Sequence, residues 1–358
     1  MRKFVHALGL LALLLTAAAP AFCAEPVDEW ERLDREATSF YRAGDFDAAL
    51  TAAKKALDLA EREFGPEHPD VALSLNTLAL AYDAKGLPDE AEPLYERSIS
   101  ILEATVGPDN LNVAAGLNNL AMLRHARGRY DQAEPLYVRS LEIREQTLAP
   151  DDPAIATSLN NLAELYRAKR EYAKAEPLYS RSLAIREKVL GPEHPSVATI
   201  LNNIAELYRL QGAYDRAYPL YKRSIGIKEK TLGADHPSVA ISLNNLALQY
   251  HSQKRYAEAE KLFIRARTIW ERALGPEHPD VAVSLANLAE VYAAQRKYAQ
   301  AEPLFVRSLA IVEKICGPDA PETARSLGDL AAFYRASGKP KKAAELEKRA
   351  AAVRSARR

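Results

Sequence analysis

Hydrophobic positions along the chain recur with the spacing of an α-helix. Between residues 153 and 168 the apolar side chains fall at positions i, i+4, i+7, i+8 and i+11, which are Ile155, Leu159, Leu162, Ala163 and Tyr166. A second stripe with the same spacing follows over residues 172–190. This periodicity places each set on one helix face. Because only a short turn at 168–171 separates the stripes, we expect two antiparallel helices that pack side by side.

The same helix pair recurs every 42 residues along the chain. A linker marks each step, at Gly65-Pro66, Gly107-Pro108, Ala149-Pro150, Gly191-Pro192, Gly233-Ala234, Gly275-Pro276 and Gly317-Pro318. Glycine suits the left-handed position that ends a helix, and proline cannot continue one. Pro195 and its equivalents then stand where the next helix begins. A fixed period of this length is typical of a solenoid, in which each unit packs only on its neighbours.

Counted by this period, the array over residues 24–355 holds about eight helix pairs. Their expected ranges are 28–63, 69–105, 111–147, 153–189, 195–231, 237–273, 279–315 and 321–355. The first and last units depart from the common pattern, as terminal caps of a repeat array do. A short basic tail follows at residues 356–358.

The repeated motif resembles the tetratricopeptide repeat (TPR). In the fifth unit the matching positions are Leu201, Ile204, Ala205, Tyr208, Gly212, Tyr214, Ala217, Tyr221 and Ser224. The 42-residue form is similar to the repeats of kinesin light chains and their bacterial relatives, over nearly the whole chain. The resemblance implies an all-α, right-handed superhelix whose first helices line a concave, peptide-binding groove. The heptad segment of kinesin light chains does not precede these repeats, so we expect a bacterial relative and not a motor subunit.

An asparagine pair recurs on the first helix of the units. The positions are Asn76, Asn118-Asn119, Asn160-Asn161, Asn202-Asn203, Asn244-Asn245 and Asn287. The resemblance places them in the groove, where a carboxamide offers a donor and an acceptor to the backbone of an extended peptide. An alternative stays open, in which these side chains bond the adjacent helix and brace neighbouring repeats.

Positions one turn further along the first helices differ between units and are candidates for peptide specificity. They include Glu164 and Arg167, Glu206 and Arg209, and His251. Their mixed charge suggests a polar or charged peptide in the middle of the groove. Each Glu and Arg also stand three residues apart on one helix, so they can pair with each other instead.

Three other sets of side chains recur without suggesting catalysis. A serine at 98, 140, 182, 224 and 308 is replaced by Ala266 and Ala350, which indicates a small packing residue. Arginines on the second helices, from Arg97 to Arg349, are expected on a solvated face with acidic neighbours. Linker histidines such as His194 suit contacts at helix N-termini. We find no catalytic, metal-binding or phosphate-binding motif, and expect neither enzymatic activity nor a cofactor.

Charge and the N-terminus bear on partners and location. The chain carries 48 basic and 48 acidic residues, which gives no electrostatic basis for binding nucleic acid. Residues 1–23 combine a basic start, an apolar stretch and small residues, so they are identified as a signal peptide. We expect an exported protein, periplasmic or secreted in a bacterial envelope, with no membrane span after cleavage. A lipid anchor on Cys23 is an alternative, disfavoured by the bulky Phe22 before it.

The predicted function is therefore a scaffold that binds an extended segment of a partner protein in the groove. The alternative is a structural adaptor that assembles an envelope complex through its edges or convex face. The identity of the partner does not follow from the residues.

Overall fold

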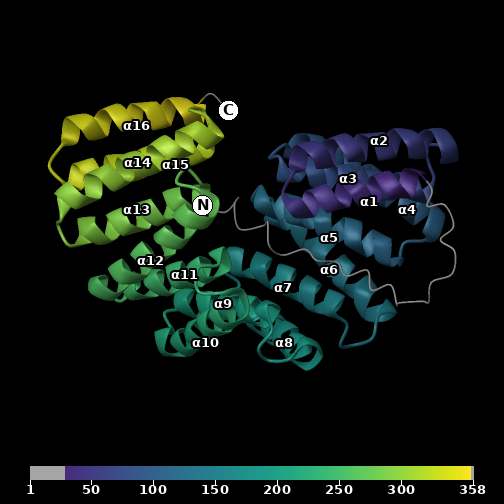
Figure 1. Cartoon of the computed structure of the whole chain (residues 1–358), viewed down its shortest axis with the longest axis horizontal. Coiled ribbons are helices and arrows are strands. Elements are labelled where there is room, and N and C mark those ends of the chain that lie inside the picture. The colour runs from purple at the N-terminus through teal and green to yellow at the C-terminus, as the bar shows by residue number, and fades with distance from the viewer. Residues whose placement is uncertain (1–28, 356–358) are drawn as a thin grey trace. The chain divides into compact units, whose positions relative to one another are not determined.

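The computed structural model describes residues 29–355, which fold into sixteen α-helices and no strands. The predicted signal peptide, Cys23 and the basic tail at 356–358 lie outside the described residues. The described chain divides into two compact parts, at residue 189 (Figure 1). The first part holds α1 (Glu29–Ala43), α2 (Phe46–Phe64), α3 (Pro69–Ala84), α4 (Pro88–Val106), α5 (Leu111–Ala126), α6 (Tyr130–Thr147), α7 (Pro153–Ala168) and α8 (Tyr172–Leu190).

The second part continues the same alternation to the C-terminal helix. It consists of α9 (Pro195–Leu210), α10 (Tyr214–Leu232), α11 (Pro237–Ser252), α12 (Tyr256–Leu274), α13 (Pro279–Ala294), α14 (Tyr298–Cys316), α15 (Pro321–Ala336) and α16 (Pro340–Ser355). Each odd-numbered helix and the even-numbered helix after it form one repeat. The all-α class is confirmed.

Contacts between neighbouring repeats build the core of each part. Within a part, the second helix of one repeat packs on the first helix of the next, as α4 does on α5 and α12 on α13. Successive first helices also contact each other directly, α3 with α5 and α11 with α13. An aromatic ring is buried at the same place in successive second helices, at Tyr95, Tyr137, Tyr179, Tyr221, Phe263 and Phe305.

The helix ends follow the linker chemistry that the sequence predicts. Gly191 and its equivalents adopt positive φ values, from 83° at Gly191 to 94° at Gly107 and Gly233. A proline occupies the first turn of most of the odd-numbered helices. Pro177 stands in the first turns of α8, where it interrupts little of the backbone hydrogen bonding. The linkers therefore set one register for every repeat.

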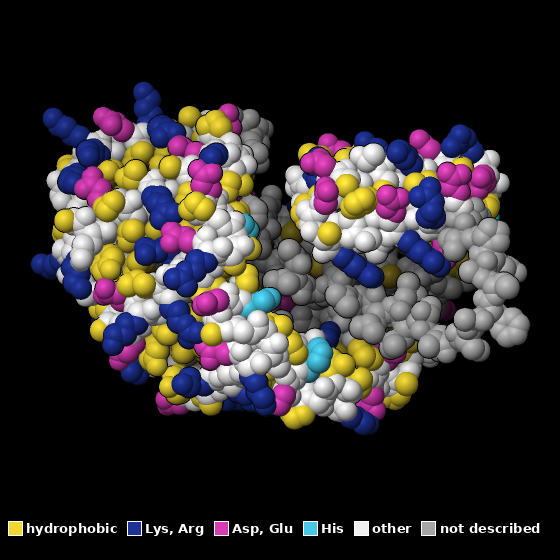
Figure 2. Space-filling view, in the orientation of Figure 1, with side chains coloured by type: hydrophobic (Ala, Val, Ile, Leu, Met, Phe, Trp, Pro, Cys, Tyr) yellow, Lys and Arg dark blue, Asp and Glu magenta, His cyan; other side chains and the backbone are white. Residues whose placement is uncertain are grey.

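The surface mixes charges of both signs, with Lys and Arg interspersed among Asp and Glu on the face in Figure 2. Between residues 29 and 355, no helix has both the length and the hydropathy that are required to cross a bilayer.

Candidate functional site

The asparagines of successive first helices bond to each other within each part of the molecule. In the first part, Nδ2 of Asn119 donates to Oδ1 of Asn76 at 3.0 Å, and Asn161 donates to Asn118 at the same distance. In the second part, Asn245 donates to Asn202 at 3.4 Å and Asn287 donates to Asn244 at 3.0 Å. Every bond runs from the second asparagine position of one repeat to the first position of the preceding repeat. We call this set of side chains the asparagine ladder.

The ladder is partly buried and keeps hydrogen-bonding capacity. Side chains at Asn118, Asn119, Asn202, Asn244 and Asn287 are buried, and those at Asn76, Asn160, Asn161, Asn203 and Asn245 are partly exposed. One ladder bond uses one N–H of the donating carboxamide and one lone pair of the accepting oxygen. A carboxamide carries two N–H groups and two lone pairs. The ladder bonds therefore fix the orientation of the amides and use only part of their capacity, although the amides of Asn118 and Asn161 also donate to the sulfur of Met122.

Glu164 and Arg167 pair with each other on α7. Nη2 of Arg167 donates to the carboxylate of Glu164, and the hydroxyl of Tyr179 donates to the same carboxylate. Burial alone would raise the pKa of Glu164, but the charge and hydrogen bond of Arg167 outweigh it and hold this pKa below its ordinary value. The carboxylate is therefore charged and neutralised by its own helix.

The next repeat has the same arrangement. Arg209 donates through Nε and Nη2 to both oxygens of Glu206, each at 2.7 Å, and Tyr221 donates to Glu206 at 2.9 Å. Burial alone would lower the pKa of Arg209, but its bonds to Glu206 raise it. The ring of His251, half-buried on α11, lies 5.7 Å from that of Tyr256 at an angle of 53°, and burial lowers the pKa of His251. The pairing of each glutamate with its own helix is thus confirmed, and both pairs present neutral polar surface.

The arginines of the second helices clamp neighbouring repeats, which the sequence did not reveal. Each binds the glutamate 36 residues before it, a linker carbonyl 31 residues before it, or both. Nη1 of Arg97 lies 2.8 Å from Glu61 while its Nη2 donates to the carbonyl of Pro66 at 3.0 Å. The same contacts recur at Arg139, Arg181, Arg223, Arg265, Arg307 and Arg349. The predicted acidic neighbours are confirmed, and the constant interval of 36 residues is the signal that identifies the clamp.

Two further cations lie buried between repeats at equivalent positions. Nζ of Lys228 donates to the hydroxyl of Ser242 at 2.9 Å and to the carbonyl of Ser238 at 3.2 Å. Nη1 of Arg144 donates to the hydroxyl of Ser158 at 2.6 Å and to a carbonyl at 3.2 Å. Burial lowers the pKa of Lys228 to about 8 and that of Arg144 to about 10. Sequence reasoning missed them because a basic residue at this position also fits an exposed face.

The serine and histidine sets have structural roles. The hydroxyl of Ser98 donates to the carbonyl of Ala72 at 2.6 Å, and the buried serines at 140, 182, 224 and 308 repeat this bond. Nδ1 of His194 accepts from the backbone N–H of Ser196 at 3.1 Å and so caps α9, as His68, His236 and His278 cap their helices. Among residues 29–355 no cluster of metal-ligating side chains occurs. The packing role of the serines and the N-terminal role of the histidines are confirmed.

Comparison with known proteins agrees with this geometry. The model of the tetratricopeptide repeat family matches residues 33–104, 112–188, 155–230, 196–262, 238–305 and 285–356. No curated protein matches the chain. Proteins built from such repeats are generally non-catalytic scaffolds for protein–protein interaction.

Solved structures extend the comparison to kinesin-light-chain-like proteins. BtubC (BKLC) from P. vanneervenii is 26% identical with a TM-score of 0.54, over 63% of this chain and 91% of that one. A putative kinesin light chain of Podosopora anserina with nearly identical TPR-like repeats is 29% identical with a TM-score of 0.50, over 58% of this chain and 99% of that one. The apo quorum sensor NprR of B. thuringiensis, 14% identical with a TM-score of 0.66 over 90% of this chain and 87% of that one, shares the fold. By sequence, repeat geometry and structural relatives, the chain belongs to the tetratricopeptide repeat family.

Proposed function

We propose that this protein is a scaffold that holds an extended segment of a partner protein along its first helices. The asparagine ladder carries the proposal, because it aligns oriented carboxamides at one place in consecutive repeats. Asparagine is a poor helix former compared with alanine, so a ladder that only filled space would favour alanine. An extended backbone offers one N–H and one C=O per residue, and the ladder keeps the complementary groups.

The spacing of the first helices suits such a segment. Packed helices lie about 8–10 Å apart, and an extended chain rises about 3.3 Å per residue. One repeat therefore corresponds to roughly three residues of the bound segment, and the ladder would hold every third peptide unit. Because the Glu164–Arg167 and Glu206–Arg209 pairs are neutral, we expect a stretch of partner that contacts either pair to be polar without a strong net charge.

A selection from a random library of linear peptides tests the proposal. Peptides that bind the wild-type protein would be compared with the Asn118→Ala, Asn161→Ala double variant and with backbone N-methylated copies of the same peptides. We expect the wild-type protein to bind peptides at least about tenfold more weakly when every third backbone N–H is methylated. We expect the same loss when the double variant binds the unmodified peptides. Arg139→Ala, which removes a clamp and leaves the ladder intact, is the matched control.

Circular dichroism would establish that each variant is folded. Selected peptides that bind the double variant as tightly as the wild type would refute the ladder as the binding surface. The asparagines would then be bracing residues alone.

Export from the cytoplasm is part of the proposal and rests on the character of residues 1–23. The intact mass of the protein purified from the envelope fraction tests it. A chain shortened by the predicted leader supports export to the periplasm or medium. Added diacylglycerol mass on Cys23 would instead show a lipid anchor, and an unprocessed chain would contradict both.

A second candidate function is assembly of an envelope complex through the linker edge of the repeats. Apolar side chains at the ends of second helices favour it, since Leu232, Leu274 and Ile315 are between 37% and 42% exposed. Exposed apolar side chains in a row can mark an interaction surface. Leu232→Gln with Leu274→Gln would disrupt assembly measured by light scattering, whereas peptide binding would persist.

A further inference from the structure

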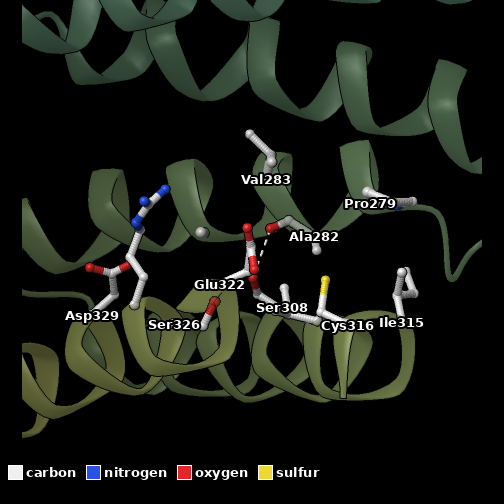
Figure 3. A pocket seen from close by; sticks show the side chains of 12 residues that line it. Pro279, Ala282, Val283, Ser308, Ile315, Cys316, Glu322, Ser326 and Asp329 are labelled. Carbon is white, nitrogen blue, oxygen red and sulfur yellow. Dashed lines mark hydrogen bonds between the residues drawn. The ribbon is translucent and has the colours of Figure 1, made fainter. Parts of the chain in front are cut away.

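A cavity opens between α13, α14 and α15 in the last two repeats. Its volume is about 70 Å³, and it opens to solvent at its mouth. Apolar side chains form much of its wall, among them Val283, Val312 and Ile315. Figure 3 shows Glu322, Ser326 and Cys316 projecting toward the helix that carries Val283. The cavity thus combines an apolar floor with polar groups on one side.

The preceding repeat shows why the cavity is there. Trp270 on α12 occupies the place equivalent to Val312, and only 3% of its surface is exposed. Cys316 likewise replaces Leu274, and Ala286 replaces Asn244 of the ladder. The two buried side chains of the preceding interface, Trp270 and Asn244, are therefore replaced by smaller ones here, and the partly exposed Leu274 is replaced by the smaller Cys316. Cys316 is half-buried in the wall and not enclosed in a core as a space-filling residue.

Two earlier repeats place a cation in the equivalent space. Lys228 and Arg144 both align with Val312, and both donate to a serine hydroxyl and to a backbone carbonyl. The equivalent serine in the last repeat is Ser326, and the equivalent carbonyl is that of Glu322. The last interface therefore keeps the two acceptors of an internal cation site, while Val312 supplies no cation.

The charge around the cavity favours a positive group. The carboxyl groups of Glu322 and Asp329 line it, against the single guanidinium of Arg325. Glu290 adds a further acidic group beside Asp329. Burial and the charge of Asp329 raise the pKa of Glu290, and burial raises that of Asp329. A cation bound here would stabilise both carboxylates.

Glu290 also differs from its equivalents in the middle repeats. Glu164 and Glu206 are each bonded by an arginine and a tyrosine of their own repeat. The residues at those two places in the seventh repeat are Ala293 and Phe305, which carry no hydrogen-bonding side chain. The last repeats thus present acidic surface where the middle repeats present neutral pairs.

We infer that this cavity binds the side chain of a lysine or arginine residue in the partner segment. The aliphatic stem lies against Val283, Val312 and Ile315, and the charged head reaches Ser326 and Asp329. Long basic side chains combine an apolar stem with a cationic head in this way. The inference rests on the proposed function, because Ala286 and Asp329 occupy ladder positions and so connect the cavity to the proposed peptide path. It predicts a partner with a basic residue at the end that lies over the last two repeats.

The probe is N-acetyl-arginine amide, with neutral N-acetyl-citrulline amide of nearly the same shape as its comparison. Binding would be followed by the methyl resonance of Ile315 and by protection of Cys316 from iodoacetamide. We expect the arginine derivative to bind at least roughly tenfold more tightly than the citrulline derivative, since hydrogen bonds to a charged group are the stronger ones. Equal binding of the two derivatives, or no shift at Ile315 with either, would overturn the inference.

Val312→Lys supplies the internal cation that Lys228 supplies in the fifth repeat, and should abolish binding of the arginine derivative. Val306→Lys adds the same charge on α14 at a position that is 45% exposed, and should leave binding unchanged. Continued binding to a folded Val312→Lys variant would also refute the site. If that variant does not fold, the comparison of the arginine and citrulline derivatives on the wild-type protein still tests the inference.

Neither probe carries a peptide long enough to span the asparagine ladder. If the protein binds the arginine derivative but selects no peptide, the cation site in the cavity is supported and peptide binding along the asparagine ladder is refuted. If it selects peptides but does not bind the derivative, peptide binding is supported and the cation site is refuted.

Discussion

Nδ2 of Asn287 lies 3.0 Å from Oδ1 of Asn244, 43 residues earlier in the chain, and both side chains are buried. The bond joins α13 directly to α11 and bypasses the helix between them. This bond adds to the few direct contacts between α11 and α13, whereas most contacts between the two repeats involve α12. The asparagines therefore brace the array whether or not they also bind a peptide, and their two roles can be separated by measurement.

Asn287→Ala should lower the free energy of unfolding by about 1–3 kcal/mol, because it leaves the buried Oδ1 of Asn244 without its ladder bond. Asn245→Ala breaks the equivalent bond to Asn202, which is longer at 3.4 Å and starts from a partly exposed side chain, so its cost should be smaller. Denaturation with guanidinium chloride measures both. Equal costs would mean that the ladder bonds contribute little beyond side-chain packing.

The 42-residue period was enough to predict the helix pairs and the positions of the ladder. Period and register place Asn244 and Asn287 on the right face, but they do not give the distance between them. That distance depends on how closely α11 and α13 approach. Lys228 illustrates the same limit, because a basic residue at its position points to solvent in most amphipathic helices. The cavity near Val312 depends on the residues at positions 286, 312 and 316 together. No one of these positions predicts it alone.

The buried ammonium group of Lys228 should make stability depend on pH in the alkaline range. Its folded pKa of about 8 lies below the value of 10.5 for an exposed lysine. The unfolded chain therefore binds more protons between these two values, and stability rises with pH across this window. Below pH 8 the folded protein carries the whole cost of the buried charge, at most about 3 kcal/mol.

Lys228→Leu should remove that cost and raise the free energy of unfolding at pH 7. Leu102 occupies the equivalent place in the second repeat and is buried, so a leucine fits. The variant should also lose the rise in stability between pH 8 and 10.5. Lys222→Leu, at an exposed position on the same helix, is the control for the loss of one positive charge. If the free energy of unfolding depends on pH in the same way in the wild type and in Lys228→Leu, the pKa of Lys228 is not lowered by folding.

The histidine caps of the linkers should be replaceable by asparagine but not by alanine. His194→Ala removes the acceptor for the N–H of Ser196 and should cost about 1 kcal/mol in unfolding free energy. His194→Asn should restore most of it, because Asn110 caps α5 with the same bond at the equivalent position. Thermal unfolding of the three proteins measures the difference. Two variants of equal stability would rule out a contribution from the cap.

The clamps of the second helices should contribute little singly, because the side chains are about half exposed. Arg265→Ala removes the contacts with Glu229 and with the carbonyl of Ala234, and should cost about 0.5–1 kcal/mol. Peptide affinity should not change, since the clamp lies on the second helices and the ladder on the first. Isothermal titration with a selected peptide checks this. A large loss of affinity in this variant would show that the peptide binds at the second helices and not at the asparagine ladder.

The pKa of the Glu164 carboxyl should be shifted in opposite directions in the wild-type protein and in a variant without Arg167. In the wild-type protein Arg167 holds its pKa below the ordinary value, so the stability that it contributes is present above the unfolded pKa and is lost as pH falls. In Arg167→Ala burial becomes the dominant influence, and the pKa should rise above the ordinary value. Stability would then increase as pH falls through that raised pKa, because the folded state binds the proton more tightly.

Adding Tyr179→Phe to Arg167→Ala reproduces the surroundings of Glu290, where Ala293 and Phe305 stand at the same two places. The double variant should therefore raise the pKa of Glu164 further. Carboxyl carbon shifts of Glu164 followed against pH give the value, with Lys188→Ala as the control for loss of a positive charge elsewhere on the repeat. If the shift in Lys188→Ala equals that in Arg167→Ala, general charge and not the pair governs this carboxylate. The missing arginine and tyrosine partners would then not explain why the last repeats are acidic where the middle repeats are neutral.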